Sequence, residues 1–219
     1  MVTTMKNKKM FGTMEYIFDI SYLSIILGFA FYYLIIASTP TSLLFGITAL
    51  VLGLGDSFHL IPRILSITKD NTTKYQVALG IGKMITSISM TIVYLLLWQI
   101  ILNTNILVDT KIWSMIIYLL AFIRIIACIL PHNKWTTNNS SDTWNIIRNI
   151  PFFMIGIIVT IGFFLIKDTS TFSYMYLAIT LSFAFYIPVV LYSKTNPKIG
   201  MLMLPKSCMY IWIIAMGIL

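Results

Sequence analysis

The chain is a succession of long apolar stretches separated by short polar segments. A helix that crosses the hydrocarbon core of a bilayer needs about 20 apolar residues. Stretches of this length lie at residues 15–37, 43–66, 76–102, 111–130, 149–166, 173–193 and 201–219. The segments between them are too short for a second domain, so the pattern predicts one all-α domain over residues 1–219, a polytopic transmembrane bundle of seven helices.

Turn-forming and polar residues mark the breaks between these stretches. Pro40 separates the first two spans, and the longest polar stretch, from Pro131 to Arg148, predicts a loop. Pro151 follows this loop, and we expect it near the first turn of its helix, where a missing N–H costs little.

The composition supports a location in the membrane. Apolar residues make up 58% of the chain and charged residues only 10%, with a mean hydropathy of +0.90, whereas a soluble domain carries about 25% charged residues. There is too little polar surface to cover a water-facing globule. A soluble enzyme, a disordered regulator and a nucleic-acid-binding module are therefore excluded.

The distribution of positive charge predicts the orientation in the membrane. If seven spans alternate, the N-terminal tail and the second, fourth and sixth loops lie on one side. These segments hold Lys6, Lys8, Lys9, Lys69, Lys74, Lys134, Arg148, Lys194 and Lys198. The opposite side holds only Lys111 and Lys167. Because cytoplasmic loops carry the excess of Lys and Arg, we expect a cytoplasmic N-terminus and an external C-terminus.

Ionisable side chains within the predicted spans point to a functional site. A charged group at the centre of a spanning helix costs about 2.5–3.5 kcal/mol on insertion scales. The residues concerned are Asp19, Asp56, His59, Arg63, Lys83, Arg124 and Lys206. Counted at 1.5 Å per residue, all of them lie in the cytoplasmic half of the membrane, although neighbouring helices run in opposite directions. This agreement predicts a common site.

Asp56 is the centre of the predicted site. Its short side chain reaches neither interface from a position near mid-membrane, and His59, three residues on, shares its face of the helix. We expect Asp56 to act as a general acid or base with His59 assisting, if the protein is an enzyme. In the same pocket, Lys83, Arg124 and Lys206 are expected to hold an anionic group, because the cations outnumber the carboxylates.

Asp19, Arg63 and Ser87 complete the predicted ligand-binding set. Structural roles stay open for several members of the whole set. Arg63 and Lys206 could extend to the headgroups along their own stems, Asp19 could cap the first helix, and Ser87 could serve helix packing.

Pro62 and Pro188 lie inside predicted spans. Each frees the carbonyl four residues earlier, which belongs to Phe58 and Ala184 respectively. A freed carbonyl in a membrane needs a partner from a neighbouring helix, a side chain or water. The pattern is compatible with helix curvature or with a hydrated pocket.

We expect no metal and no cofactor. The chain has two histidines, His59 and His132, too few for a three-histidine zinc site, and its two cysteines, Cys128 and Cys208, form no disulfide framework. The expected partners are the lipid bilayer and an anionic lipid or similar amphiphile. Nucleic acid is not an expected partner, and the oligomeric state stays open.

Three segments resemble those of a group of uncharacterised seven-span bacterial membrane proteins. They are residues 54–63, 182–188 and 204–208. This resemblance covers nearly the whole chain and implies a multi-pass protein of the bacterial cytoplasmic membrane, without implying an activity.

Leu54-Gly55-Asp56 also resembles the Leu-Gly-Asp in the second helix of the YhhN-like lysoplasmalogenases. Those multi-span enzymes cleave the vinyl-ether bond of lysoplasmalogens. They carry a Ser-Asp pair in a later helix, where this chain has Ser182-Phe183. The resemblance therefore implies a role for Asp56 alone.

The leading functional hypothesis is the binding or processing of an anionic amphiphile, by a lipid-like hydrolase or a lipid-binding protein. Whether the protein is an enzyme stays open. One alternative is a proton-coupled carrier of small solutes in which Asp56 relays the proton. Another is a structural membrane protein without a ligand, in which the charges pair among themselves.

Overall fold

The chain folds into a bundle of long helices. The computed structural model describes residues 2–69, 72–137, 142–168, 172–193 and 195–218, and no strand occurs among them. The helices are α1 (Val2–Ile36), α2 (Pro40–Thr68), α3 (Thr72–Asn103), α4 (Lys111–Ile129), α5 (Asp142–Leu165), α6 (Met175–Tyr192) and α7 (Met203–Ala215). Short 3₁₀ helices are η1 (Pro131–Asn133), η2 (Pro197–Leu202) and η3 (Met216–Ile218). The predicted all-α fold is confirmed.

Seven helices of the described chain are long and apolar enough to cross a membrane. The seventh candidate span, Lys198–Ile218, joins α7 to the short helices on either side of it. Large apolar side chains cover the outside of the bundle; Ile35 is 82% exposed and Phe122 is 62% exposed. Such a surface suits acyl chains rather than water, which confirms the predicted membrane-embedded bundle. Leu219, the end of the last predicted span, lies outside the described residues.

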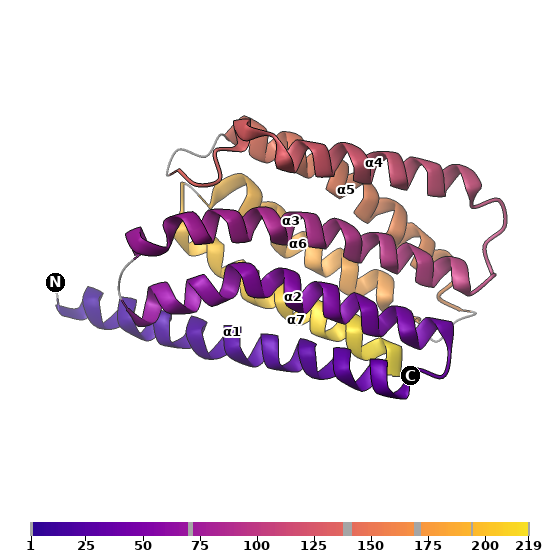
Figure 1. The fold of residues 1–219 in the computed structure, drawn as a ribbon, viewed down its shortest axis with the longest axis horizontal. Helices are drawn as coiled ribbons and strands as arrows, with labels where there is room; N and C mark the ends of the chain where they lie inside the picture. The colour runs from indigo at the N-terminus through magenta and orange to yellow at the C-terminus, as the bar shows by residue number, and fades with distance from the viewer. Residues whose placement is uncertain (1, 70–71, 138–141, 169–171, 194, 219) are drawn as a thin grey trace.

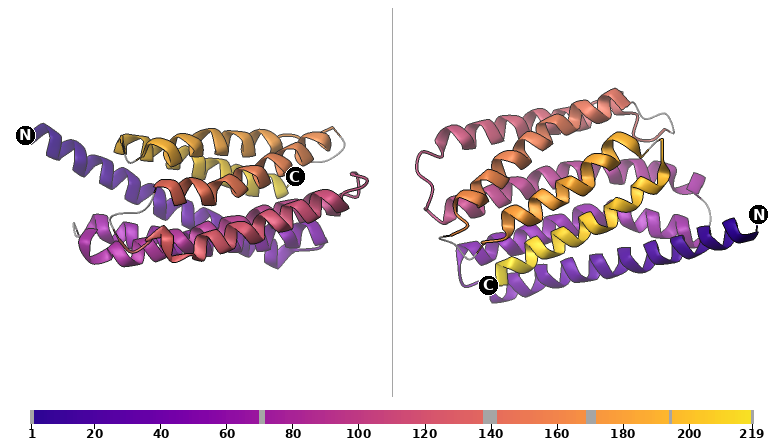
Figure 2. Two further views of the ribbon diagram at one scale, coloured as in Figure 1. Left: turned by 90° about the horizontal axis from the view of Figure 1, so that it is seen from above. Right: turned by 180° about the vertical axis from the view of Figure 1, so that it is seen from behind.

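The helices form two layers (Figure 1). Helices α2, α3 and α4 make up one layer and α5, α6 and α7 the other, while α1 lies along α2 and α7 (Figure 2). The end of the bundle that holds the N-terminus is called the N end below, and the opposite end, with the C-terminus, is called the C end (Figure 1). Helices α1, α3, α5 and α7 run from the N end to the C end, and the others return.

The turns follow from the sequence signals at the breaks. Thr39 caps α2, because its hydroxyl accepts from the Ser42 N–H at 3.1 Å and Pro40 occupies the first turn. At the other end of the bundle, the Asn133 side chain closes α4 by donating to the carbonyls of Ala127 at 2.6 Å and Leu130 at 2.8 Å. These bonds satisfy groups that a helix terminus leaves unpaired.

The predicted loop up to Arg148 is shorter than expected. Helix α5 begins at Asp142, so Arg148 is helical and Pro151 lies in the helix interior rather than in its first turn. The first turns of α5 are polar because their side chains bind the rest of the protein. Arg148 donates to the Asn133 side chain at 2.9 Å, and Asn145 donates to the Val190 carbonyl of α6 at 3.1 Å.

Small residues bring α2 and α3 into close contact. Thr86 donates to the carbonyl of Gly55 at 2.9 Å. A Cβ added at Gly82 would lie 2.2 Å from the carbonyl oxygen of Phe58, the oxygen that Pro62 deprives of its helical partner. The backbone of α3 therefore covers this freed carbonyl, and no side chain larger than glycine fits there without movement.

Candidate functional site

Arg124 of α4 is the most unusual buried residue of the bundle. Its side chain is 2% exposed and its guanidinium lies over the ring of Phe152, 3.4 Å from the ring centroid. Arginine stays protonated in proteins. Nevertheless, Nε and Nη1 are buried without any hydrogen-bond partner in the described part of the chain. Buried donors are normally satisfied, so these two N–H groups are available to an acceptor.

Lys206 of α7 is a second buried cation, only 7% exposed. Its ammonium lies 4.3 Å from the ring centroid of Tyr186 on α6 and 5.4 Å from that of Tyr210 on α7. Such placements stabilise a cation through the ring quadrupole. The charges of Lys206 and Arg124 interact electrostatically, so both face one interior region.

Five side chains define this region, which is called the cation cluster below. They come from α4, α5, α6 and α7 and are Arg124, Phe152, Tyr186, Lys206 and Tyr210. Hydroxyl groups extend its lining: the hydroxyls of Tyr94 and Tyr210 are 3.4 Å apart, and both interact with the side chain of Ser182, which is 1% exposed. The region can therefore both attract an anion and donate hydrogen bonds to it.

Asp56 of α2 points into the bundle. It accepts a hydrogen bond from the hydroxyl of Tyr22 on α1 at 2.7 Å, and its charge interacts with that of Lys206. Between described residues, the ion pair within 4 Å is that of Arg63 and Glu15, so Asp56 and Lys206 face each other without closing a direct pair. Asp56 thus lies beside the cation cluster and leaves Lys206 free to bind another anion.

His59 lies apart from Asp56. Its Nδ1 is buried without a hydrogen-bond partner, and it interacts with the charges of Lys83 and Arg63 and with the backbone of Leu79. No hydrogen bond joins His59 to Asp56 in the part of the chain that the structure describes. The catalytic pairing of these residues stays a prediction.

Arg63 and Asp19 belong to a separate group on α1 and α2. Arg63 Nε donates to Glu15 Oε1 at 2.6 Å, and Glu15 stands at the very start of the first predicted span. Asp19 is 5% exposed and its Oδ2 is buried without a hydrogen-bond partner. Its charge interacts with those of Arg63, Glu15 and Asp56, so this group adjoins the cation cluster through Asp56.

Lys83 and Ser87 lie on the α3 surface. Lys83 is exposed, and its charge interacts with those of Arg63 and Arg148 rather than joining the cation cluster. Ser87 donates to the carbonyl of Lys83 at 2.8 Å, within its own helix. A ligand-binding role for Lys83 and Ser87 stays a prediction, and neither residue is part of the cation cluster.

Aromatic residues are the part of the site that sequence reasoning missed. Tyr22, Tyr186, Tyr210 and Phe152 were counted among the apolar residues, although three of them carry a hydroxyl into the site. One signal was present: Tyr210 follows Lys206 by four residues and so shares its helix face. No comparable spacing links Tyr22 to Asp56 or Tyr186 to Lys206, because those contacts join different helices.

Arg148, which is partly buried, shows what an arginine with hydrogen-bond partners looks like in the same bundle. It lies over the Trp135 ring at 4.1 Å and donates to the side chains of Asn133 at 2.9 Å and Asn145 at 2.7 Å. Arg124 has the stacking partner and the Cys128 thiol beside it, but its Nε and Nη1 lack acceptors among the described residues. The difference makes Arg124 a candidate ligand-binding group.

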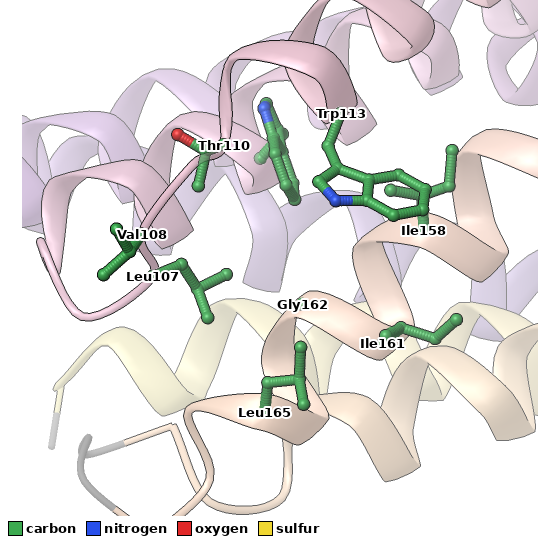
Figure 3. Close-up of a pocket in the computed structure, with 9 residues that line it drawn as sticks. Leu107, Val108, Thr110, Trp113, Ile158, Ile161, Gly162 and Leu165 are labelled. Atoms are coloured by element: carbon green, nitrogen blue, oxygen red, sulfur yellow. The ribbon is translucent and has the colours of Figure 1, made fainter.

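A cavity of about 150 Å³ lies near the C end, away from the cation cluster. It is lined by Trp98, Leu107, Val108, Thr110, Trp113, Ile158, Ile161, Gly162 and Leu165, which come from α3, α4, α5 and the α3–α4 connection (Figure 3). Trp98 turns its indole N–H to Ser114 at 2.9 Å. This lining offers apolar contact and no charge.

The described residues contain no group of three His, Cys, Asp or Glu side chains that could hold a metal ion. Comparisons with models of protein families, with curated proteins and with solved structures found no significant match. The family resemblances stay predictions, and the function is proposed from the geometry of the site.

Proposed function

We propose that this protein binds an amphiphile with an anionic headgroup, such as a phosphate or carboxylate, at the cation cluster. The observation that carries the proposal is the guanidinium of Arg124, which is stacked on Phe152 and has two buried N–H groups without acceptors. A phosphate or carboxylate oxygen accepts from such donors in charge-assisted hydrogen bonds. Lys206 adds a second charge from the opposite layer of the bundle.

The charges of the site favour an anion. Arg124 and Lys206 contribute two positive charges, and Asp56, the carboxylate that interacts with Lys206, contributes one negative charge. Uncompensated charge in a low-dielectric interior is costly. A bound anion compensates the surplus and fills the acceptor positions at the same time.

The location of the cation cluster favours a ligand with an apolar tail. The cation cluster lies within helices of membrane-spanning length, and the outer surface of these helices is apolar. A ligand that partitions into the bilayer reaches this depth with its tail in the acyl chains. We propose that the N end faces the cytoplasm, because the predicted loops at that end carry the excess of lysine and arginine.

Binding requires less of the site than catalysis does. A hydrolytic reaction with Asp56 and His59 needs the two side chains to act on one substrate, and no hydrogen bond joins them in the described chain. The binding proposal uses Arg124 and Lys206 as they stand.

The test is a titration of the purified protein in a neutral maltoside detergent. Dodecyl phosphate is the probe, with dodecanol as the uncharged control and inorganic phosphate as the control without a tail. We expect dodecyl phosphate to bind and both controls to bind at least about tenfold more weakly, a difference of about 1.4 kcal/mol.

Variants connect the titration to the site. Lys206→Met should weaken the binding of dodecyl phosphate at least about tenfold. The control Lys198→Met removes an exposed lysine from the neighbouring η2 and should leave the affinity for dodecyl phosphate within about twofold of the wild type. Equal binding of dodecanol and dodecyl phosphate would refute an anion site. Strong binding of inorganic phosphate alone would identify a free anion as the ligand.

A further inference from the structure

A line of titratable side chains leads from the N end of α1 to Asp56. Glu15, Asp19 and Tyr22 are spaced by four and three residues, so they follow one face of α1. At 1.5 Å per residue the line covers about 10 Å of helix. It ends at the hydrogen bond from Tyr22 to Asp56, 2.7 Å long.

Asp19 is the middle member of this line and has no evident structural task. It is 5% exposed, and its Oδ2 is buried without a hydrogen-bond partner in the described chain. It interacts electrostatically with Glu15 and Arg63 on the N-end side and with Asp56 on the other. A buried carboxyl between two other carboxyls is suited to pass a proton between them.

The groups that face Asp56 come from each helix packed around it. Helix α1 contributes Tyr22, and α7 contributes Lys206 and Tyr210, whose interactions include Asp56. Helix α3 meets this turn of α2 with the hydroxyl groups of Thr86 and Ser89, which contact Gly55. Lys206 is thus the cation that interacts with Asp56, and it belongs to the cation cluster.

The charge of the ligand decides whether Asp56 can stay ionised. With a monoanion bound, the charges of Arg124, Lys206, Asp56 and the ligand sum to zero. With a dianion bound, one negative charge is in excess, and like charges repel strongly in a low dielectric. Protonation of Asp56 removes that excess and keeps the hydrogen bond with Tyr22 possible.

We propose that the binding of a dianionic headgroup is coupled to the uptake of one proton by Asp56, and that the proton arrives from the N end through Asp19. This inference rests on the proposed anion binding. In the step, an O–H bond of the Asp19 carboxyl breaks and an O–H bond forms on Asp56. Asp19 then regains a proton from water at the N end, past Glu15.

The number of protons taken up on binding is measured by calorimetry of the full-length protein in buffers that differ in ionisation enthalpy. At about pH 8 dodecyl phosphate is a dianion, whereas dodecane sulfonate is a monoanion. We expect uptake of about one proton for each bound dodecyl phosphate and about none for the sulfonate. Asp56→Asn should abolish the uptake, while its binding of the sulfonate shows that the variant is folded.

The route of the proton through Asp19 is tested by stopped-flow mixing of the protein and dodecyl phosphate with a pH-indicator dye. Asp19→Asn should slow proton uptake by at least about tenfold and leave the final number of protons unchanged. The matched control is Asp109→Asn, which makes the same substitution at an exposed position of the C end. It should match the wild type in both rate and extent.

Each outcome has a separate meaning. Uptake that persists in Asp56→Asn would place the proton on the ligand and overturn the coupling through Asp56. A wild-type rate in Asp19→Asn would overturn the route. Binding that depends on Lys206 but takes up no proton would overturn the coupling alone, whereas binding indifferent to Lys206→Met would overturn the proposed anion site as well.

Discussion

The two halves of the bundle fill the space between their helices with different kinds of side chain. Towards the C end the helices enclose aromatic and aliphatic side chains, and polar groups there find backbone partners; Tyr33, for example, donates to the carbonyl of Ile214 at 2.6 Å. Towards the N end the same helices enclose the charged groups of Arg124, Lys206 and Asp19, and atoms of Arg124 and Asp19 lack hydrogen-bond partners among the described residues. The comparison teaches that apolar packing dominates the C-end half, whereas the N-end half holds the polar groups of the proposed anion site.

The strongest test of this division removes an aromatic ring from the C-end half. Phe45 is fully buried and its ring lies 5.5 Å from that of Phe172. Phe45→Ala should lower the free energy of unfolding by about 3–4 kcal/mol, because it leaves a cavity. Equilibrium unfolding in detergent measures the loss, and dodecyl phosphate should still bind the folded fraction with wild-type affinity. A weaker affinity would show that the two halves are not separable.

A smaller effect is expected where α2 and α3 touch. Gly82→Ala should lower the free energy of unfolding by about 2–3 kcal/mol, because the new Cβ would lie 2.2 Å from the Phe58 carbonyl oxygen. Gly28→Ala is the matched control, since nothing lies within 4 Å of a Cβ at Gly28. It should be neutral or raise stability by up to about 1 kcal/mol. Equal melting temperatures for both variants would contradict the close packing.

The smallest effect is expected from the hydroxyl that holds Asp56. Tyr22→Phe removes the 2.7 Å hydrogen bond to Asp56, and we expect a loss of about 1–2 kcal/mol in the free energy of unfolding. Tyr32→Phe, at a 44% exposed position of the same helix, should change stability by less than about 0.5 kcal/mol. The difference between the two thermal melts checks the prediction; no difference would mean that Tyr22 does not support Asp56.

The sequence predicts how deep each charged residue lies in the membrane, but it does not predict which way its side chain points. Helices rise by a constant 1.5 Å per residue, so the positions of Arg124, Lys206 and Asp56 along the spans predict that all three lie in the same half of the membrane. Which way each side chain faces depends on how helices far apart in the sequence pack. Lys83 is therefore predicted in the same half of the membrane, yet it lies exposed on α3.

Residues with both polar and apolar character were the other source of error. Tyr186 and Tyr210 counted as apolar in the pattern, so the aromatic lining of the cation cluster went unnoticed. Conversely, the polar residues Asn145 and Arg148 predicted a loop, although they lie on α5 and bind Val190 and Asn133. A polar run predicts a loop only if its side chains face water.

The most direct test of the anion site measures the affinity for dodecyl phosphate in Arg124→Met, with Lys111→Met as the control. Both substitutions remove one positive charge from α4, at a buried and at an exposed position respectively. We expect Arg124→Met to bind at least about tenfold more weakly without a loss of thermal stability, since methionine replaces a buried charge that lacks partners, and Lys111→Met to bind like the wild type. Equal affinities for all three proteins would contradict a binding role for the cation cluster.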